Sequence, residues 1–291
     1  MSHPSSLSQH SGAHDHGQHH HGQHHHDEAG LADLLDLDAE VLAPLLDEVG
    51  KWAAQHAPEQ VRTVVDVGAG TGTASLALAR RFAAAEVVAV DRSATMLQRL
   101  REAATAQGLA HRLRAVQCDL DAGWPPVREV DLAWASSSLH ELAQPDRVLG
   151  DIHAALSPGG LLVVVEMDGL PRFLADDVGL GGPGLEPRCH EALAREGWNQ
   201  HPDWRPHLES AGFDVLAQRT FTLDADPAPP ATGGYAHAFL RRVRAALDGG
   251  LAPEDLDVFD QLVADDGPHA LRHRADLALH ASRTAWAARR P

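Results

Sequence analysis

The sequence has few of the residues that mark several common classes of protein. Its 291 residues include two cysteines, Cys118 and Cys189, which lie far apart and in no metal-ligand spacing. A disulfide framework is therefore not expected, and a reducing compartment is the default. No apolar run approaches the roughly 20 residues of a membrane helix, and the first residues lack the basic-then-apolar pattern of a signal peptide. We expect a soluble cytoplasmic protein without a membrane partner.

Basic residues are also scarce. The chain has 24 Lys and Arg residues against 41 Asp and Glu residues, a formal net charge of −17. An acidic chain repels phosphate backbones, so a nucleic-acid partner is disfavoured. The hydrophobic content of 44% is ordinary for a globular protein, and the length allows one large α/β domain with additions. Nothing in the composition predicts the oligomeric state.

The first 28 residues are of low complexity and contain ten histidines. They offer almost no apolar side chains to offset the entropy of ordering, so we expect residues 1–28 to be disordered. Neutral imidazole is a good ligand for zinc, nickel or copper, so two histidine triplets could chelate a divalent metal; the alternative is an idle tail or a tag. These triplets are His19, His20, His21 and His24, His25, His26, and no metal site is expected in the core.

From residue 61 to residue 166 short apolar runs alternate with helical patterns. This alternation predicts a parallel sheet with helices on both faces. Before it, residues 31–57 have helical spacing with a kink at Pro44. After it the regularity ends: residues 167–203 read as irregular, and helices and strands of less regular spacing follow. The strands are expected at 64–67, 86–91, 113–118, 130–135, 161–166, 213–223 and 277–288, and the later helices at 204–211, 235–247 and 253–264.

A glycine-rich turn joins the first strand to the next helix. The residues from Asp66 to Gly72 read Asp-Val-Gly-Ala-Gly-Thr-Gly. Glycines at alternate positions remove the Cβ atoms that would keep a ligand away from the backbone, and the helix N-terminus adds unpaired N–H groups. Ligands of such sheets bind at the carboxyl ends of the strands, where Asp91, Asp119 and Glu166 also fall. The pattern predicts a polar small-molecule site there.

The turn departs from the G-x-G-x-x-G pattern of dinucleotide-binding proteins. Its third glycine comes one position early, with Thr73 in the expected slot, and Asp66 would repel a pyrophosphate. A ligand with an ammonium group tolerates such an acid. Asp91 lies nineteen residues after Gly72, where a ribose-binding carboxylate belongs. The site therefore suits a nucleoside that carries a positive charge and little phosphate.

These motifs resemble those of the class I S-adenosylmethionine-dependent methyltransferases that act on small molecules. The resemblance covers roughly residues 61–167, with weaker support from 204–223 and 277–288. It rests on the glycine turn, the acid at the end of the second strand, Cys118-Asp119-Leu120-Asp121, and the Ser-Pro-Gly-Gly run that ends at Gly160. It implies a doubly wound, mostly parallel seven-stranded Rossmann-like sheet whose last strand is antiparallel.

The resemblance also implies a domain plan. A helical segment at 29–60 precedes a core made of 61–223 and 277–291. Segments 167–203 and 224–276 are expected to form a helical cap over the acceptor, because they are longer than simple connections. Trp198, Tyr235 and His237 in these segments, together with Trp204 directly after the first of them, are predicted to line the acceptor pocket.

By the same resemblance, the cofactor is S-adenosyl-L-methionine (SAM). The turn approaches its methionine part, ordered by Asp66, and Asp91 accepts hydrogen bonds from both ribose hydroxyls. The neighbouring residues contact the adenine, and Ala135 and Ser136 supply backbone near the sulfonium. The implied cofactor-binding residues are Asp66, Gly68, Ala69, Gly70, Gly72, Asp91, Arg92, Met96, Asp119, Leu120, Ala135 and Ser136. Met96 is equally compatible with a core position, and Asp119 with a helix cap.

Methyl transfer needs in-line positioning and, for a protonated acceptor atom, a base. His140 follows the fourth strand, and Glu166 ends the fifth. Both are candidates for catalysis on a small-molecule acceptor, and a histidine that merely packs against the neighbouring loop is the alternative to the first. Two other functions stay open from the residues alone: an NAD(P)-dependent oxidoreductase, and a non-catalytic metal-binding or regulatory protein on the same scaffold.

Overall fold

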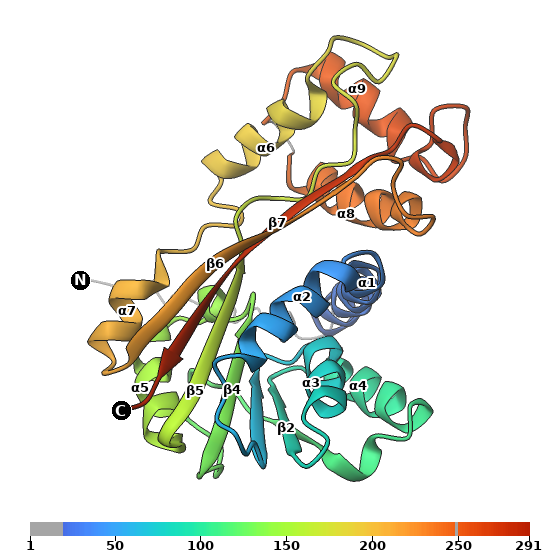
Figure 1. The fold of residues 1–291 in the computed structure, drawn as a ribbon. Helices are drawn as coiled ribbons and strands as arrows, with labels where there is room; N and C mark the ends of the chain where they lie inside the picture. Colours follow the sequence, from blue (N-terminus) through green and yellow to red (C-terminus); the bar gives the residue numbers. More distant parts are fainter. Residues whose placement is uncertain (1–19, 248–249) are drawn as a thin grey trace, which may run out of the picture.

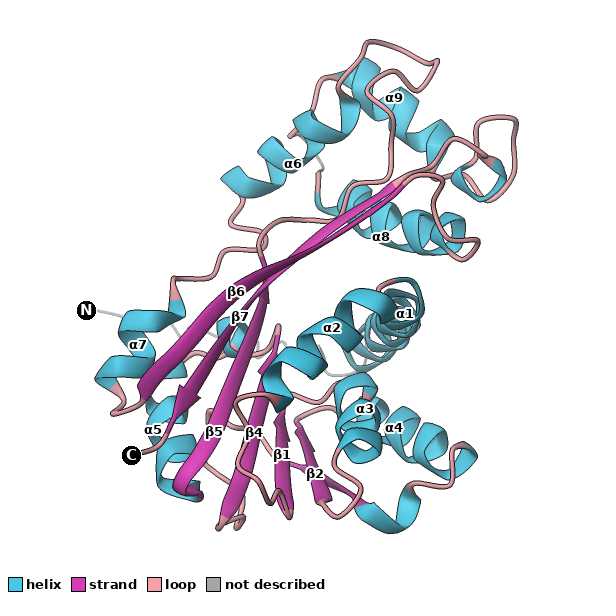
Figure 2. Ribbon diagram, viewed as in Figure 1, coloured by secondary structure: helices cyan, strands magenta, loops and turns pink. Residues whose placement is uncertain are grey.

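The computed structural model describes residues 20–247 and 250–291, with the side chains of 20–27 left out. In this part of the chain, nine α-helices and seven strands build a sheet layered between helices, with a cap at one end (Figures 1 and 2). The strands are β1 (Thr63–Val67), β2 (Glu86–Asp91), β3 (Leu113–Gln117), β4 (Val130–Ser136), β5 (Leu156–Met167), β6 (Asp214–Ala225) and β7 (Leu279–Arg289). The helices are α1 (His20–Val41), α2 (Ala43–Ala54), α3 (Thr73–Arg81), α4 (Ala94–Ala106), α5 (Pro145–Ala155), α6 (Leu185–Arg195), α7 (Trp204–Ser210), α8 (Thr232–Ala246) and α9 (Pro253–Leu262).

The strands form one sheet in the order β3-β2-β1-β4-β5-β7-β6. β1 lies at its centre, parallel to β2 on one side and to β4 on the other. Val64, Val65 and Val67 of β1 are fully buried, as expected of a strand that is covered on both faces. The order reverses direction at β1, which is where open α/β sheets bind ligands.

β7 runs antiparallel to both of its neighbours, so the sheet is mixed. The prediction of a mostly parallel seven-stranded sheet is therefore confirmed in strand number and general plan, and the antiparallel strand lies between β5 and β6. β6 and β7 continue beyond the rest of the sheet as a long two-stranded ribbon that leads into the cap (Figure 2).

Two helical layers cover the faces of the sheet. The apolar sides of α2 and α3 pack on one face, through residues such as Val49 and Leu76. α5 and α7 pack on the other, through residues such as Ile152 and Leu208. The apolar side of each of these helices thus packs on the sheet, and the polar side faces away from it. Among the described helices, none is long and apolar enough to cross a membrane.

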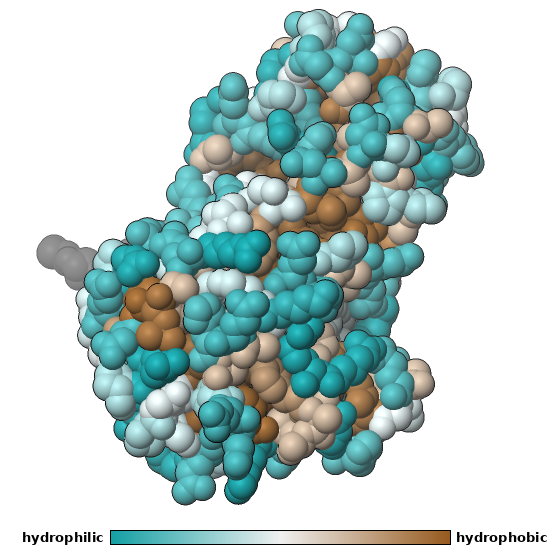
Figure 3. Space-filling model, in the orientation of Figure 1, coloured by the Kyte–Doolittle hydropathy of each residue, from teal (hydrophilic) through white to brown (hydrophobic). Residues whose placement is uncertain are grey.

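The cap consists of α6, α8 and α9 together with the far ends of β6 and β7. They share a separate apolar core with part of α1, which includes Tyr235, Phe239 and Phe259. α6 lies inside the segment 167–203, which is predicted from the sequence to be irregular. The helix is missed because the glycines and prolines of this segment mask its helical spacing. On the face in Figure 3, apolar side chains gather over α8, where the cap meets the ribbon.

The N-terminal region differs from the prediction at two places. The chain breaks between α1 and α2 at Leu42, and Pro44 lies in the first turn of α2, where its missing N–H would have no helical partner. α1 begins at His20, inside the segment 1–28 that the sequence predicts to be disordered. Residues 1–19 lie outside the described part of the chain.

The glycine turn follows β1 with three residues in the left-handed region, Gly68, Gly70 and Gly72. At Gly72, where φ is +91°, an added Cβ would lie 2.5 Å from Leu100 Cγ of α4. The glycine therefore serves the backbone conformation and the close packing of two helices at once.

We expect Gly72→Ala to lower the free energy of unfolding by roughly 2–4 kcal/mol, because strain and overpacking add. Gly108→Ala is the matched control: Gly108 has φ of +69° with no atom near the added Cβ, so it reports the strain alone. Urea unfolding of both variants measures the difference. Equal losses in the two variants would contradict the packing argument.

Candidate active site

The carboxyl ends of the central strands are tied to one another by backbone hydrogen bonds. The N–H groups of Gly68 and Ala69 both donate to Val90 O of β2, at 2.9 Å each. On the other side, Ser137 N donates to Val165 O of β5 at 2.8 Å. The glycine turn and the loop after β4 thus lie at one edge of the sheet, as the sequence predicted for the ligand site.

Asp91 joins β2 to this turn. Its Oδ2 accepts from Gly70 N and its Oδ1 from Ser93 N, each at 2.8 Å. A carboxylate has about four lone-pair positions, so two remain on this half-buried side chain. Two free acceptor positions next to a glycine turn fit the two hydroxyls of a ribose.

Asp66 lies behind the turn and not on its open side. Its side chain is 1% exposed, and Oδ2 accepts from Ser75 Oγ of α3 at 2.6 Å. Burial, with a smaller contribution from Asp91, raises the pKa of Asp66 to about 7. Asp66 therefore holds α3 against β1, which makes it a positioning residue for the turn. Ser75 was not singled out by the sequence.

The walls of the turn come from two distant segments. Ser138 Oγ donates to Val67 O at 2.6 Å, and its Cβ fills the space next to Gly68. On the other side Leu35 of α1 lies against Gly70, where an added Cβ would be 3.3 Å from its Cδ1. α1 thus forms one wall of the site.

The residues expected to contact adenine have different exposures. Arg92 is exposed at the end of β2, and Asp119 is exposed after β3 with Oδ1 accepting from Asp121 N at 3.0 Å. Met96 and Leu120 are 5% and 6% exposed and belong to the apolar core. In the part of the chain that the structure describes, no group donates to the second oxygen of Asp119. Ala135 and Ser136 end β4 next to the turn, with Ser136 half-buried.

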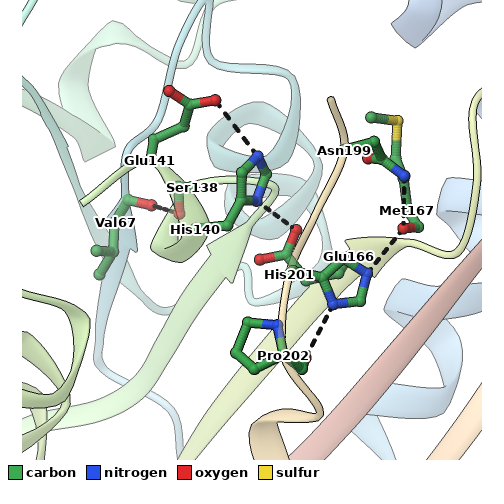
Figure 4. Close-up of polar contacts among 9 residues, drawn as sticks. All are labelled: Val67, Ser138, His140, Glu141, Glu166, Met167, Asn199, His201 and Pro202. Carbon is green, nitrogen blue, oxygen red and sulfur yellow. Dashed lines mark hydrogen bonds and ion pairs between the residues drawn. The ribbon is translucent and has the colours of Figure 1, made fainter. Parts of the chain in front are cut away.

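His140 and Glu166, which are 26 residues apart in the sequence, meet in the structure (Figure 4). His140 Nδ1 lies 2.9 Å from Glu166 Oε2, and Nε2 lies 3.4 Å from Glu141 Oε1. The hydrogen bonds to Glu141 and Glu166 raise the pKa of His140 to about 10. At neutral pH the ring is therefore an imidazolium that donates from both nitrogens, and it has no free position from which to accept a proton.

Two side chains of the segment 198–202 lie at the end of β5, and sequence reasoning did not single them out. Asn199 Nδ2 and His201 Nε2 both lie within hydrogen-bond distance of Met167 O, at 3.2 and 2.8 Å, next to Glu166 (Figure 4). The ring of His201 also stacks edgewise on Trp286 of β7. The segment 198–202 thus covers the end of β5.

Other expected site residues lie elsewhere. Trp204 is buried under the sheet with α7, so the prediction that it lines the acceptor pocket is wrong. Cys189 is buried, which raises its thiol pKa to about 12 and excludes it as a nucleophile at neutral pH. In the described ranges no three His, Cys, Asp or Glu side chains gather as a metal site requires. His19 and the side chains of the remaining tail histidines lie outside what the structure describes.

Asp66→Asn tests how the buried carboxyl of Asp66 changes the free energy of unfolding with pH. Because burial raises the pKa of Asp66 above its usual 3.8 to about 7, the folded protein binds the proton more tightly than the unfolded chain. Its stability should therefore fall as the pH rises from 4 to 7. The Asn variant keeps an oxygen for Ser75 and should lack this fall, measured by urea unfolding across that range. Identical pH profiles would contradict the assignment.

His140→Gln tests the imidazolium. A pKa raised from 6.5 to about 10 means that the stabilisation is complete below pH 6.5 and is lost as the pH rises toward 10. At pH 6 we expect the free energy of unfolding of the wild-type protein to be higher than that of the variant by roughly a few kcal/mol. At pH 10 the two values should be nearly equal. If the difference in the free energy of unfolding is the same at pH 6 and pH 10, the prediction that His140 is an imidazolium is wrong.

The chain is similar to known methyltransferases. A family model described as a methyltransferase domain matches residues 64–160. Trans-aconitate 2-methyltransferase of Klebsiella pneumoniae is 30% identical over 221 residues, which are 64% of this chain and 82% of that protein. The same-named protein of Paracidovorax citrulli is 37% identical over 121 residues, but the match spans only 42% of its length.

A solved structure shares the fold. The structure of a candidate methyltransferase from Bacillus halodurans has a TM-score of 0.52 and 17% identity, and the match covers 87% of this chain and 99% of that one. The family model covers the glycine turn and the strands around it, and the Klebsiella relative is matched over most of its length. This protein therefore belongs to the class I S-adenosylmethionine-dependent methyltransferases, as the motifs of its sequence predicted.

Proposed function

We propose that this enzyme transfers the methyl group of SAM to an O, N or S atom of a small-molecule acceptor by in-line displacement. The observation that carries the proposal is the position of Asp91, which has two free lone-pair positions beside the glycine turn and lies at the same sheet edge as His140 and Glu166. Binding groups and candidate reacting groups thus face one site.

The chain's own residues divide into two sets. Asp91 accepts from the ribose hydroxyls, Asp119 accepts from the adenine amino group, and the backbone from Gly68 to Gly72 lies along the methionine part. When bound, SAM supplies a methyl group activated by its positive sulfur. Since that reagent is already reactive, the protein contributes orientation and exclusion of water.

At the acceptor side, Glu166 and His140 form a fixed pair. His140 holds its proton on Nδ1, 2.9 Å from Glu166 Oε2, and thereby orients the carboxylate. Because His140 is already protonated at neutral pH, Glu166 is the better candidate for receiving a proton from the acceptor. This reverses the order of the two candidates suggested by the sequence, where His140 came first.

The names of the relatives favour a second candidate, methylation of a carboxylate oxygen. Trans-aconitate is a tricarboxylate, and a carboxylate needs no base, because it carries no proton at neutral pH. An NAD(P)-dependent oxidoreductase is not supported, since the matches are to methyltransferases.

Asp91→Ala should weaken SAM binding by at least about 100-fold, because a charged acceptor of two hydroxyls is lost. Isothermal titration with SAM and with S-adenosylhomocysteine measures the loss. Asp131→Ala is the matched control: Asp131 also accepts two backbone N–H groups, from Arg62 and Thr63, but at the opposite end of the sheet. It should lower stability and leave the affinity within about twofold.

Normal affinity in the Asp91 variant, or an equal loss in both variants, would contradict the ribose assignment. If the wild-type protein binds neither SAM nor S-adenosylhomocysteine, the proposed function itself fails, and the non-catalytic alternative gains support.

A further inference from the structure

Two buried acceptor atoms at the end of β5 have no hydrogen-bond partner. Glu166 Oε1 and Asn199 Oδ1 are both hidden from solvent, and no residue that the structure describes donates to either. The side chain of Glu166 is only 1% exposed. Buried polar atoms are nearly always paired, so an unpaired one calls for an explanation.

The other atoms of these side chains are well bonded, so their orientation is fixed. Glu166 Oε2 faces His140 Nδ1 at 2.9 Å, and Asn199 Nδ2 donates to Met167 O at 3.2 Å. These contacts determine which oxygen of Glu166 and which atom of the Asn199 amide stay unpaired. Both unpaired atoms are acceptors, and both belong to the group of side chains in Figure 4.

The charges around Glu166 also limit which acceptor can bind there. His140 supplies one positive charge between the carboxylates of Glu141 and Glu166, which leaves an excess of one negative charge. Asp168, two residues further along, adds another and is bound by the Ser282 hydroxyl. One more positive side chain, Arg92, is exposed and attracts the carboxylate of Glu141. An anionic acceptor would therefore meet repulsion beside Glu166.

We propose that the acceptor is a neutral or cationic molecule, an amine or a hydroxyl compound, whose N–H or O–H donates to Glu166 Oε1, and that polycarboxylates are excluded. This inference rests on the proposed function. The segment 198–202 contributes specificity, because Asn199 Oδ1 offers the same molecule a second acceptor. Glu166 is thus a specificity-determining residue as well as the base.

The reaction balances with these groups alone. The acceptor attacks through a lone pair, so an ammonium acceptor first gives up one proton; its N or O atom then forms a bond to the methyl carbon as the C–S bond breaks, and the electron pair of the C–S bond stays on sulfur. The proton of the acceptor passes to Glu166 Oε1, which is neutral afterwards and returns the proton to solvent after product release. His140 keeps its own proton throughout and acts through Glu166 as a positioning residue.

The test compares two panels of acceptors with the full-length enzyme and methyl-labelled SAM. One panel holds catechol, tyramine and putrescine, and the other holds succinate, citrate and trans-aconitate. Binding of SAM is measured first, by titration, so that a failure to bind the cofactor is separate from a failure of acceptor choice. We expect methylation in the first panel and none in the second.

Glu166→Gln isolates the unpaired oxygen. Glutamine keeps an oxygen for His140 but turns N–H groups toward the acceptor, which reverses the polarity at that point. We expect kcat/KM to fall by at least about 100-fold while SAM affinity stays within about twofold. Glu141→Gln removes the other carboxylate that contacts His140. Because the side chain of Glu141 is 67% exposed, we expect this variant enzyme to retain the preference for amines or hydroxyls.

Each remaining outcome counts against the proposal. Faster methylation of a carboxylate, full activity of Glu166→Gln, or the loss of SAM binding in that variant would overturn it. So would a SAM-binding enzyme that methylates no member of the amine and hydroxyl panel.

Discussion

The site depends on one carboxylate, that of Asp91, which receives a backbone N–H from each of two loops. Gly70 belongs to the turn after β1, and Ser93 begins the helix after β2. The same carboxylate thereby fixes the ligand-side backbone and keeps acceptor positions free. Because charged acceptors bind N–H groups more strongly than neutral ones, the turn is held open in one conformation before any ligand arrives.

Buried carboxyl groups recur through the structure, and each holds a segment that the backbone alone would not fix. Asp66 bonds Ser75 of α3, and Glu186 of α6 accepts from the N–H groups of Phe173 and Leu174. Burial raises the pKa of each to about 7. Glu166 differs because one of its oxygens is unpaired, and a group left unsatisfied in the interior is typical of a functional site.

The cap and the cofactor region are joined through α1. Leu35 lies against Gly70, while Asp38, one turn later, accepts from the Tyr235 hydroxyl of α8 at 2.6 Å and lies 3.4 Å from Arg283 of β7. One helix therefore touches the turn, the cap and the ribbon. The end of β5 is covered by Asn199 and His201, which come from the irregular stretch before α7 and both lie within hydrogen-bond distance of Met167 O.

The sequence by itself determined the turn, the alternation of strands and helices, and the family, because these depend on local spacing and on the rule that parallel strands end at one edge. The position of Asp91 beside the turn could be predicted on that basis alone. Only the tertiary structure decided that Asp66 is buried behind the turn, that His140 lies between the carboxylates of Glu141 and Glu166, and that Asn199 bonds the backbone of Met167, next to Glu166. Those features depend on burial and on contacts between residues far apart in the chain, which have no fixed spacing. Trp204 shows the same limit, since its place under the sheet follows from the packing of α7.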